Sequence, residues 1–555
     1  MKFTEFVKNN KIMCILFPIV ASLVYAPLVF INGYFPDAEH VSVNGTPFYN
    51  WENLGRFGLI ALKTITGLKN YNRIAEAIAF CVAFTALTFF FSYFVCYINK
   101  KIPAGFAFLS AYLFLIFPTY TDQYVFQFQS FEVTFALLLT VVSAFLMVLF
   151  VRKKAVWAFI LSIFLSAFSF GVYQSMLSAS LALIYMVSVL LYDVESDTLS
   201  ASGTSNENKN TQKAEYIFIN KLFRSFISPF GYMILGSIQL CLSAGVYKII
   251  EKLTCKTGTY ITNQIAWKTS GFAYCFNNLK QYIKTVLFGL KYMYTNVFLF
   301  ASALALFALV FAFIKNGKKA LSIIIPLIGL YASPFFMAIV MGSEPAPRTQ
   351  CALPLCTAAL MLFTYSVFSS SFAKSNEHDI RKDKNRRMQI VLLLLIASIM
   401  IFLNLYKTER LIYSYRVIAQ SDRENALRIA NDLKQYNCNA DDEDSKPVVF
   451  IGTIRGMTND ITYEYNPDNR EYVLTSVFIL DEGIDPQYYY SSKRILGYMK
   501  MLGYNYKNPE PGDMAEAYAK GENMVQYPGA ELKGQDYIKE TDNIIIVRLT
   551  NYSPY

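Results

Sequence analysis

Long apolar runs separated by short polar segments fill the chain from residue 12 to residue 406. A helix that crosses a membrane needs about 20 mostly apolar residues. The pattern therefore predicts a polytopic α-helical protein. Its eleven spanning helices are expected at residues 12–31, 74–98, 103–119, 130–151, 155–173, 175–192, 228–250, 295–314, 320–341, 351–372 and 388–406.

Lys and Arg residues lie at alternate ends of these runs. Basic clusters precede the first run and follow every even-numbered run, as Arg152-Lys153-Lys154 does after the fourth. Because short cytoplasmic loops carry an excess of Lys and Arg, this alternation predicts a cytoplasmic N-terminus and an extracytoplasmic C-terminus. The first run has the basic start of a signal peptide. It is longer than a typical one and no small-x-small cleavage site follows, so we expect it to be retained.

Two segments have the composition of soluble protein. Residues 193–215 are rich in Ser, Asn and Lys, so we expect a disordered cytoplasmic loop. Residues 407–555 have an ordinary mixed composition, which predicts a small extracytoplasmic α/β domain. The chain would then divide into a transmembrane domain, 1–406, and a C-terminal domain, 407–555.

The C-terminal segment contains signals for one helix and two strands. Residues 421–436 have an amphipathic pattern, with Ser421 at the N-cap and Glu424 at the capping-box position. Residues 447–453 and 543–549 are rich in the β-branched and apolar residues of strands.

Composition supports a membrane protein and excludes an ordinary soluble one. Hydrophobic residues make up 54% of the chain, charged residues 16%, and the mean hydropathy is +0.32. Soluble domains usually have about 25% charged residues. The net charge of +10 does not indicate nucleic-acid binding, because much of it lies in loops between apolar runs. Cys255 and Cys275 share one loop and could pair if that loop is extracytoplasmic, and two histidines are too few for a histidine-based metal site.

The first predicted outer loop, at about 32–73, contains a candidate catalytic site. Asp37 and Glu39 lie two residues apart, just beyond the first spanning helix. A carboxylate at the membrane surface can act as general base toward an acceptor hydroxyl, although acidic loop residues are often only solvated. Residues 51–65 follow with an amphipathic pattern, and such a helix can lie in the headgroup plane.

Other polar residues lie at further predicted outer turns. Arg348 stands at the outer entrance of a span, against the charge bias. The planar fork of Arg suits phosphate, whereas a lone interfacial Arg more commonly only reaches out to the headgroups. Asp122 follows the third span, and Tyr173 and Gln174 lie between two apolar runs, where Gln174 could equally cap a turn.

Four ordered stretches resemble a known family. Their order is similar to that of membrane glycosyltransferases with the GT-C architecture. More narrowly, it resembles the type II glucosyltransferase family that modifies bacterial surface polysaccharides such as O-antigen. That family often has adjacent acidic residues in its first outer loop, whereas Ala38 separates them here, which leaves open which carboxylate is the base. The stretches are Asp37–Glu39 with Trp51-Glu52-Asn53-Leu54-Gly55-Arg56, Gly171-Val172-Tyr173-Gln174-Ser175, Pro347-Arg348 with Leu353-Pro354, and Tyr415-Arg416 with Asp422-Arg423 and 426–429.

The resemblance implies a polyprenyl-phosphate sugar, with glucose as the sugar, as donor. It implies a polysaccharide or glycolipid acceptor at the outer face of the bacterial cytoplasmic membrane. Asp37 would deprotonate the acceptor hydroxyl with help from Glu39, and a divalent cation such as Mg²⁺ or Mn²⁺ at this pair stays open but is not assigned. The donor phosphate and the rest of the substrate would be bound by Arg56, Asp122, Tyr173, Gln174 and Arg348.

Two other classes of protein share part of this pattern. A transporter or flippase of lipid-linked saccharide would show intramembrane charges and repeated broken helices. The predicted spans are almost free of central charges and show no internal repeat, so this is the alternative rather than the leading hypothesis. A polymerase-like or ligase-like membrane enzyme has the same kind of composition and stays open.

Overall fold

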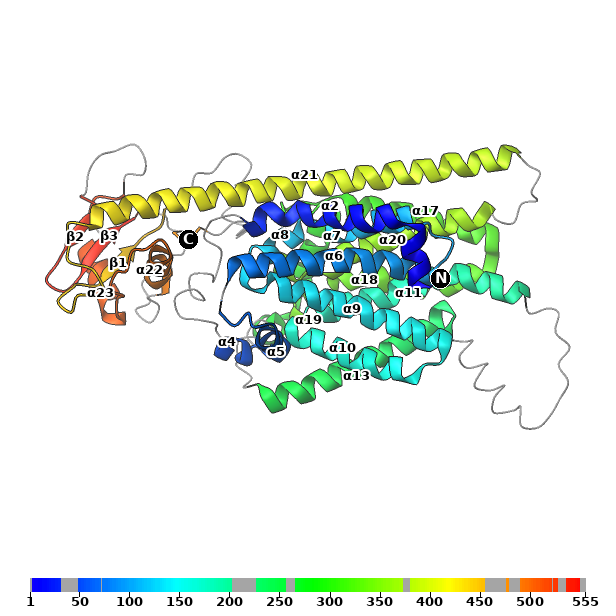
Figure 1. The fold of residues 1–555 in the computed structure, drawn as a ribbon, viewed down its shortest axis with the longest axis horizontal. Coiled ribbons are helices and arrows are strands. Elements are labelled where there is room, and N and C mark those ends of the chain that lie inside the picture. Colours follow the sequence, from blue (N-terminus) through cyan, green and yellow to red (C-terminus); the bar gives the residue numbers. More distant parts are fainter. Residues whose placement is uncertain are drawn as a thin grey trace.

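The computed structural model is a helical bundle with a small α/β unit at one end (Figure 1). Helices account for most of the elements, as the long apolar runs predict. The structure describes residues 2–30, 48–70, 72–201, 226–255, 265–372, 380–454, 476–478, 490–521, 523–527 and 536–549.

All eleven segments predicted to span a membrane are helical. Among the described residues, eight helices are long and apolar enough to cross a membrane. They are α2 Lys11–Phe30, α6 Arg73–Ile98, α9 Gln127–Lys153, α13 Pro229–Thr254, α17 Val297–Asn316, α18–α19 Leu321–Met341, α20 Ala352–Phe372 and α21 Ile380–Leu433. The other three segments contain α7 Ala104–Leu115, α10 Val156–Val172 and α11 Met176–Ala201, whose apolar parts are shorter.

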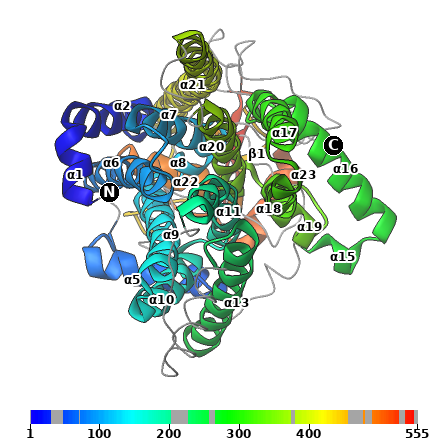
Figure 2. The ribbon, with the colours of Figure 1, turned by 90° about the vertical axis from the view of Figure 1, so that its right-hand side faces the viewer.

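The helices pack around a central pair. Figure 2, a view along the bundle, places α11 and α20 in the middle and α2, α13, α16 (Phe272–Phe288) and α21 around the outside. Most of α20 is buried, which its apolar residues on every face allow. Large apolar side chains such as Leu253, Phe307 and Ile314 remain exposed on outer helices. Apolar surface of this kind is compatible with a membrane protein.

Helix α21 differs from its prediction. It runs unbroken from Ile380 to Leu433, so Ser421 lies inside a helix and is not an N-cap. The predicted start at residue 421 was wrong because the segment contains no Gly or Pro that would end the preceding helix. At 54 residues the helix is about 81 Å long, far beyond the roughly 30 Å of a bilayer core.

The far end of α21 packs on a small sheet. Strand β1 (Val448–Ile451) pairs in parallel with β3 (Ile545–Arg548), and β3 pairs antiparallel with β2 (Ile538–Glu540). The end of α21 and helix α22 (Tyr490–Met501) cover one face of the sheet, and α23 (Pro511–Gly521) covers the other. Burial on both faces explains the uninterrupted apolar residues of β1 and β3. These two strands confirm the predicted ones, while the division of the chain at residue 406 stays a prediction.

Among the described residues, one further expectation failed, and a pairing that the sequence left open is not formed. Helix α11 continues to Ala201, into the segment expected to be disordered, because no Gly or Pro lies between Met176 and Gly203. Residues 202–215 of that segment lie outside the described residues. Cys255 and Cys275 have free thiols and do not form a disulfide. The Cys275 thiol is buried and faces Gly342.

Candidate functional site

Two short helices, α4 (Phe48–Asn53) and α5 (Phe57–Thr66), lie at the end of the bundle that faces the α/β unit (Figure 1). They replace the single amphipathic helix expected at 51–65, because Gly55 turns the chain with a φ of +70°. A Cβ on Gly55 would collide with the Glu251 carboxylate and approach the Tyr247 hydroxyl to 2.9 Å. The apolar side of α4–α5 packs on α9 and α10.

Arg56 lies at the start of α5 and points into the protein. Its Nη1 donates a hydrogen bond to Gln129 Oε1 at 3.2 Å, and its guanidinium lies 5.0 Å from the centre of the Tyr173 ring. Tyr173 follows the last residue of α10, where the backbone becomes extended. Gly171 in the same turn leaves room for the ring of Phe57, whose atoms would otherwise lie 2.5–2.8 Å from a Cβ. This close packing brings Arg56 onto Tyr173.

Arg348 lies in the short 3-10 turn Pro347–Thr349 and is held by Asp122 of α8 (Thr119–Tyr124). The Arg348 backbone N–H donates to Asp122 Oδ2 at 3.0 Å, and its Nη1 lies 3.7 Å from the same oxygen. Burial raises the pKa of Asp122, and the charge and hydrogen bonds of Arg348 offset part of that rise. The Arg348 side chain is 37% exposed, so it can still meet a ligand.

The two arginines approach one tyrosine. The charges of Arg56, Arg348 and Asp122 all act on the Tyr173 hydroxyl. Tyr415 of α21 lies within electrostatic range of Asp122 and Arg348. Four of the predicted binding residues therefore gather at one end of the bundle, although they come from four different segments. Tyr415 completes the group and was not predicted as a site residue, although it lies in one of the stretches that carried the resemblance.

Gln174, the fifth predicted binding residue, lies beside this group and contacts the protein backbone. Its Nε2 donates to the Leu54 carbonyl at 2.5 Å and to the Tyr247 hydroxyl at 3.4 Å. Gln174 thus holds the turn that precedes Arg56.

Asp37 and Glu39, the predicted catalytic carboxylates, lie outside the described residues. The described residues before and after the segment that contains Asp37 and Glu39 contact the first turn of α9. Gln127 Nε2 donates to the Leu28 carbonyl at 3.0 Å, and Trp51 stacks on Phe128 with ring centres 5.9 Å apart. Gln129, which binds Arg56, is in the same turn. Leu28, before the loop, and Trp51, after it, therefore both contact the turn of α9 that binds Arg56.

Sequence analysis missed two buried charged groups near α4–α5. Lys63 contacts Glu76 and Glu132, and the Glu251 carboxylate accepts a hydrogen bond from Tyr247 at 3.0 Å. Glu132 lies within a predicted span, and an ionisable residue inside an apolar run is a signal for a functional or paired group.

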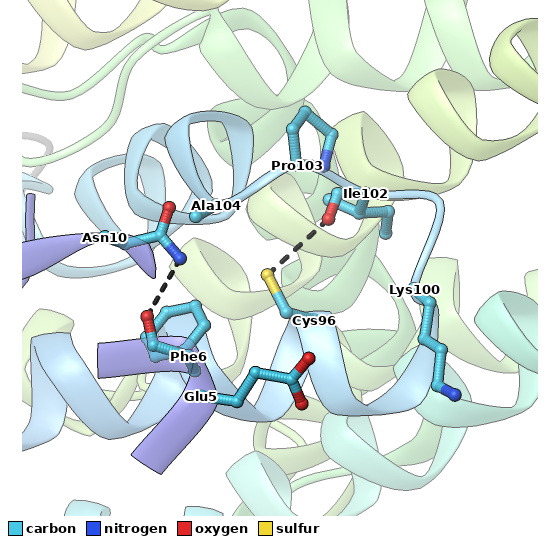
Figure 3. Close-up of a pocket in the computed structure, with 8 residues that line it drawn as sticks. All are labelled: Glu5, Phe6, Asn10, Cys96, Lys100, Ile102, Pro103 and Ala104. Carbon is cyan, nitrogen blue, oxygen red and sulfur yellow. Dashed lines mark hydrogen bonds between the residues drawn. The ribbon is translucent and has the colours of Figure 1, made fainter. Parts of the chain in front are cut away.

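A cavity of about 350 Å³ is lined in part by the N-terminal residues (Figure 3), which lie at the end of the bundle away from α4 and α5 (Figure 1). The cavity end of α6 contributes Cys96, while its opposite end carries Glu76, roughly 30 Å away along the helix. None of the predicted site residues that the structure describes lines this cavity. Its lining residues are Glu5, Phe6, Asn10, Cys96, Lys100, Ile102, Pro103 and Ala104.

Metal-binding chemistry is not apparent in the described part of the chain. No group of three or more His, Cys, Asp or Glu side chains among the described residues could hold a metal ion. The Asp37–Glu39 pair is not among those residues.

The exposed apolar helices and the polar group at one end of the bundle are compatible with a membrane enzyme. Residues 26–365 match the family of glucosyl transferase GtrII, and the chain belongs to this family. No match was found among curated proteins. Family membership confirms the resemblance drawn from the sequence motifs and indicates a glucosyltransferase. The matched region includes every predicted site residue, from Asp37 to Arg348.

Proposed function

We propose that the protein transfers glucose from a polyprenyl-phosphate carrier to a cell-surface polysaccharide such as O-antigen. The observation that carries the proposal is the position of Arg56 over the Tyr173 ring and of Arg348 beside Asp122, at one end of an apolar bundle. A lipid-linked donor diffuses within the bilayer, so its phosphate arrives at headgroup depth. Two arginines at the end of a membrane bundle suit a phosphate at that depth.

The chemistry requires one bond to form and one to break. The acceptor hydroxyl attacks C1 of the sugar, and the bond between C1 and the phosphate oxygen breaks. The electron pair of that bond leaves with polyprenyl phosphate, and Asp37 takes the hydroxyl proton with help from Glu39. Arg348 and Arg56 stabilise the negative charge that grows on the phosphate, which is a large term in such reactions.

The predicted topology places this reaction outside the cytoplasm of a bacterial cell. The α/β unit and α4–α5 lie toward the same end of the bundle (Figure 1). The positive-inside pattern predicts that the C-terminal segment is extracytoplasmic, which would put Arg56 on the same face. The N-terminus would then be cytoplasmic, and the eleven helices would form a GT-C-like membrane domain.

Transport of a lipid-linked saccharide is the alternative that the sequence left open. Buried charges are present, since Lys63, Glu76 and Glu132 form an ion cluster. Each of its two carboxylates is in the first two turns of its helix, near the bundle end rather than its middle. Family membership also favours transfer over transport.

The proposal is tested with purified protein in proteoliposomes and polyprenyl-phosphate glucose labelled in the sugar. Transfer predicts release of unlabelled polyprenyl phosphate and movement of label to a polysaccharide acceptor. A nucleotide-linked glucose should give no product. Movement of intact labelled lipid across the bilayer without release of polyprenyl phosphate would establish transport and overturn the proposal.

A further inference from the structure

A buried ion triad links α5 to two helices of the bundle. Lys63 Nζ lies 2.6 Å from Glu76 Oε1 of α6 and 2.8 Å from Glu132 Oε1 of α9. The three side chains are 2%, 1% and 0% exposed. The single charged residue of the short helix α5 is thus fixed at its charged end to both α6 and α9.

Of the helices joined by the triad, α5 and α9 are also connected through Arg56, which lies at the start of α5. Arg56 binds Gln129 and Lys63 binds Glu132, so the two contacts are three residues apart on α9 and lie on one face of it. Arg56 and Lys63 are seven residues, or about two turns, apart along α5. The helix is therefore attached to α9 at both ends.

Helix α5 also packs so closely against α10 that little room is left for α5 to move. A Cβ on Gly58 of α5 would lie 2.6 Å from the Phe168 carbonyl oxygen and 2.7 Å from the Val172 nitrogen. Val172 immediately precedes Tyr173, the ring beneath Arg56. A shift of α5 along α9 would thus displace Arg56 from Tyr173.

Structural stability alone does not explain the triad. Two carboxylates share one ammonium, and Glu76 Oε2 and Glu132 Oε2 are buried with no hydrogen-bond partner among the described residues. A buried ion cluster of this kind often stabilises a fold less than apolar side chains of equal volume would. Such a cluster can instead fix one arrangement of helices.

We infer that Lys63 is a positioning residue for the donor phosphate, acting through Arg56. The inference rests on the proposed function, in which Arg56 contacts that phosphate. Lys63 holds the far end of α5 on α6 and α9, and this hold keeps the Arg56 guanidinium over Tyr173. Loss of Lys63 then weakens donor binding, although Lys63 itself touches no substrate.

The test compares Lys63→Met, Arg56→Ala and the double variant in the transfer assay. Lys63→Met should raise KM for polyprenyl-phosphate glucose about tenfold and change kcat less, because a displaced Arg56 loses its charge-assisted hydrogen bonds. In an Arg56→Ala background the added Lys63→Met change should have almost no effect, since neighbours that act as a unit are not additive. Lys446→Met, which breaks the 2.7 Å ion pair with Glu540 in the α/β unit, is the matched control and should leave KM unchanged.

A second readout follows α4–α5 without activity. In a Trp157→Phe/Trp267→Phe background only Trp51 remains, and its ring is 4% exposed and stacked on Phe128. Lys63→Met should shift Trp51 emission to longer wavelength as the helix pair loosens. If Lys63→Met does not fold, the charge exchange Lys63→Glu/Glu132→Lys decides the question, since it keeps one ammonium between two carboxylates. The exchange should restore KM to within about threefold of wild type.

The outcomes separate the inference from the proposed function. Three results would overturn the inference alone. They are a folded Lys63→Met protein with wild-type KM, a rise in KM from Lys63→Met that is just as large in the Arg56→Ala background, and a folded exchange variant whose KM does not return toward wild type. Arg56→Ala with wild-type kinetics overturns the role of Arg56 in the proposed function, and the inference falls with it.

Discussion

At the scale of single residues, Asp122 fixes the position of Arg348 and leaves its guanidinium partly exposed. The Asp122 carboxylate accepts the backbone N–H of Arg348, so it fixes the turn as well as balancing charge. The guanidinium of Arg348 lies 4.9 Å from the centre of the Phe126 ring. It is therefore held in place while part of its surface stays open to a ligand.

Arg348→Ala should raise KM for the lipid-linked donor and lower kcat, because both the bound phosphate and its leaving charge lose a partner. Arg348→Lys should recover only part of the activity, since an ammonium lacks the two-pronged geometry of a guanidinium. Steady-state kinetics over a range of donor concentrations measure both effects. Wild-type turnover of Arg348→Ala at every donor concentration would show that Arg348 does not bind the donor and only contacts the lipid headgroups.

The catalytic base is the second prediction at this scale. Asp37→Asn keeps the side-chain shape and removes the proton acceptor, so transfer should fall about 10²–10⁴-fold. Donor binding should change little, because Arg56 and Arg348 hold the phosphate. Glu39→Gln should lower the rate of transfer less than Asp37→Asn does. If Asp37→Asn is active and Glu39→Gln is dead, the two roles are exchanged, and full activity of both variants would remove the first outer loop from the mechanism.

At the scale of elements, sequence patterns predicted the helices well and their ends poorly. Apolar runs mark a helix wherever the chain passes through the bundle, so every predicted span contains a helix, and eight of the described helices are long and apolar enough to cross a membrane. Ser421 shows the limit: a good capping sequence does not begin a helix when the residues before it can continue one. The break at Gly55 was also missed, and the close approach of Glu251 and Tyr247 to Gly55 joins residues far apart in sequence.

Gly55→Ala should therefore impair the site. Alanine would have to keep a φ of +70° and would clash with the Glu251 carboxylate, so we expect lower thermal stability and a raised donor KM. Gly67→Ala is the matched control, since Gly67 has a φ of +74° and open space around its Cβ. Equal losses in the two variants would show that backbone strain alone, rather than the Glu251 contact, matters at Gly55.

The site itself was predictable in part. Residue type and family motifs selected Arg56, Tyr173 and Arg348, and the structure brings these residues to one end of the bundle. Tyr415 and Lys63 could not be placed, because their relevance depends on how α21 and α5 pack. A lysine on an amphipathic helix looks solvated until the partner helices are known.

At the scale of the whole molecule, the account depends on which face of the membrane each end of the bundle meets. A reporter that is active only outside the cytoplasm should be active when fused after residue 555 and silent when inserted at about residue 205. The alternation of Lys and Arg across the apolar runs is the physical reason. The reverse pattern would place the Arg56–Arg348 end in the cytoplasm and contradict an extracytoplasmic reaction.

The most direct measurement is a cryo-electron microscopy structure of the protein with polyprenyl phosphate. The two ends of the bundle offer different binding places, with Arg56 and Arg348 at one and the cavity beside Lys100 at the other. The account predicts phosphate density within about 3 Å of both guanidinium groups. Phosphate density in the cavity beside Lys100, with none at Arg56 and Arg348, would contradict it.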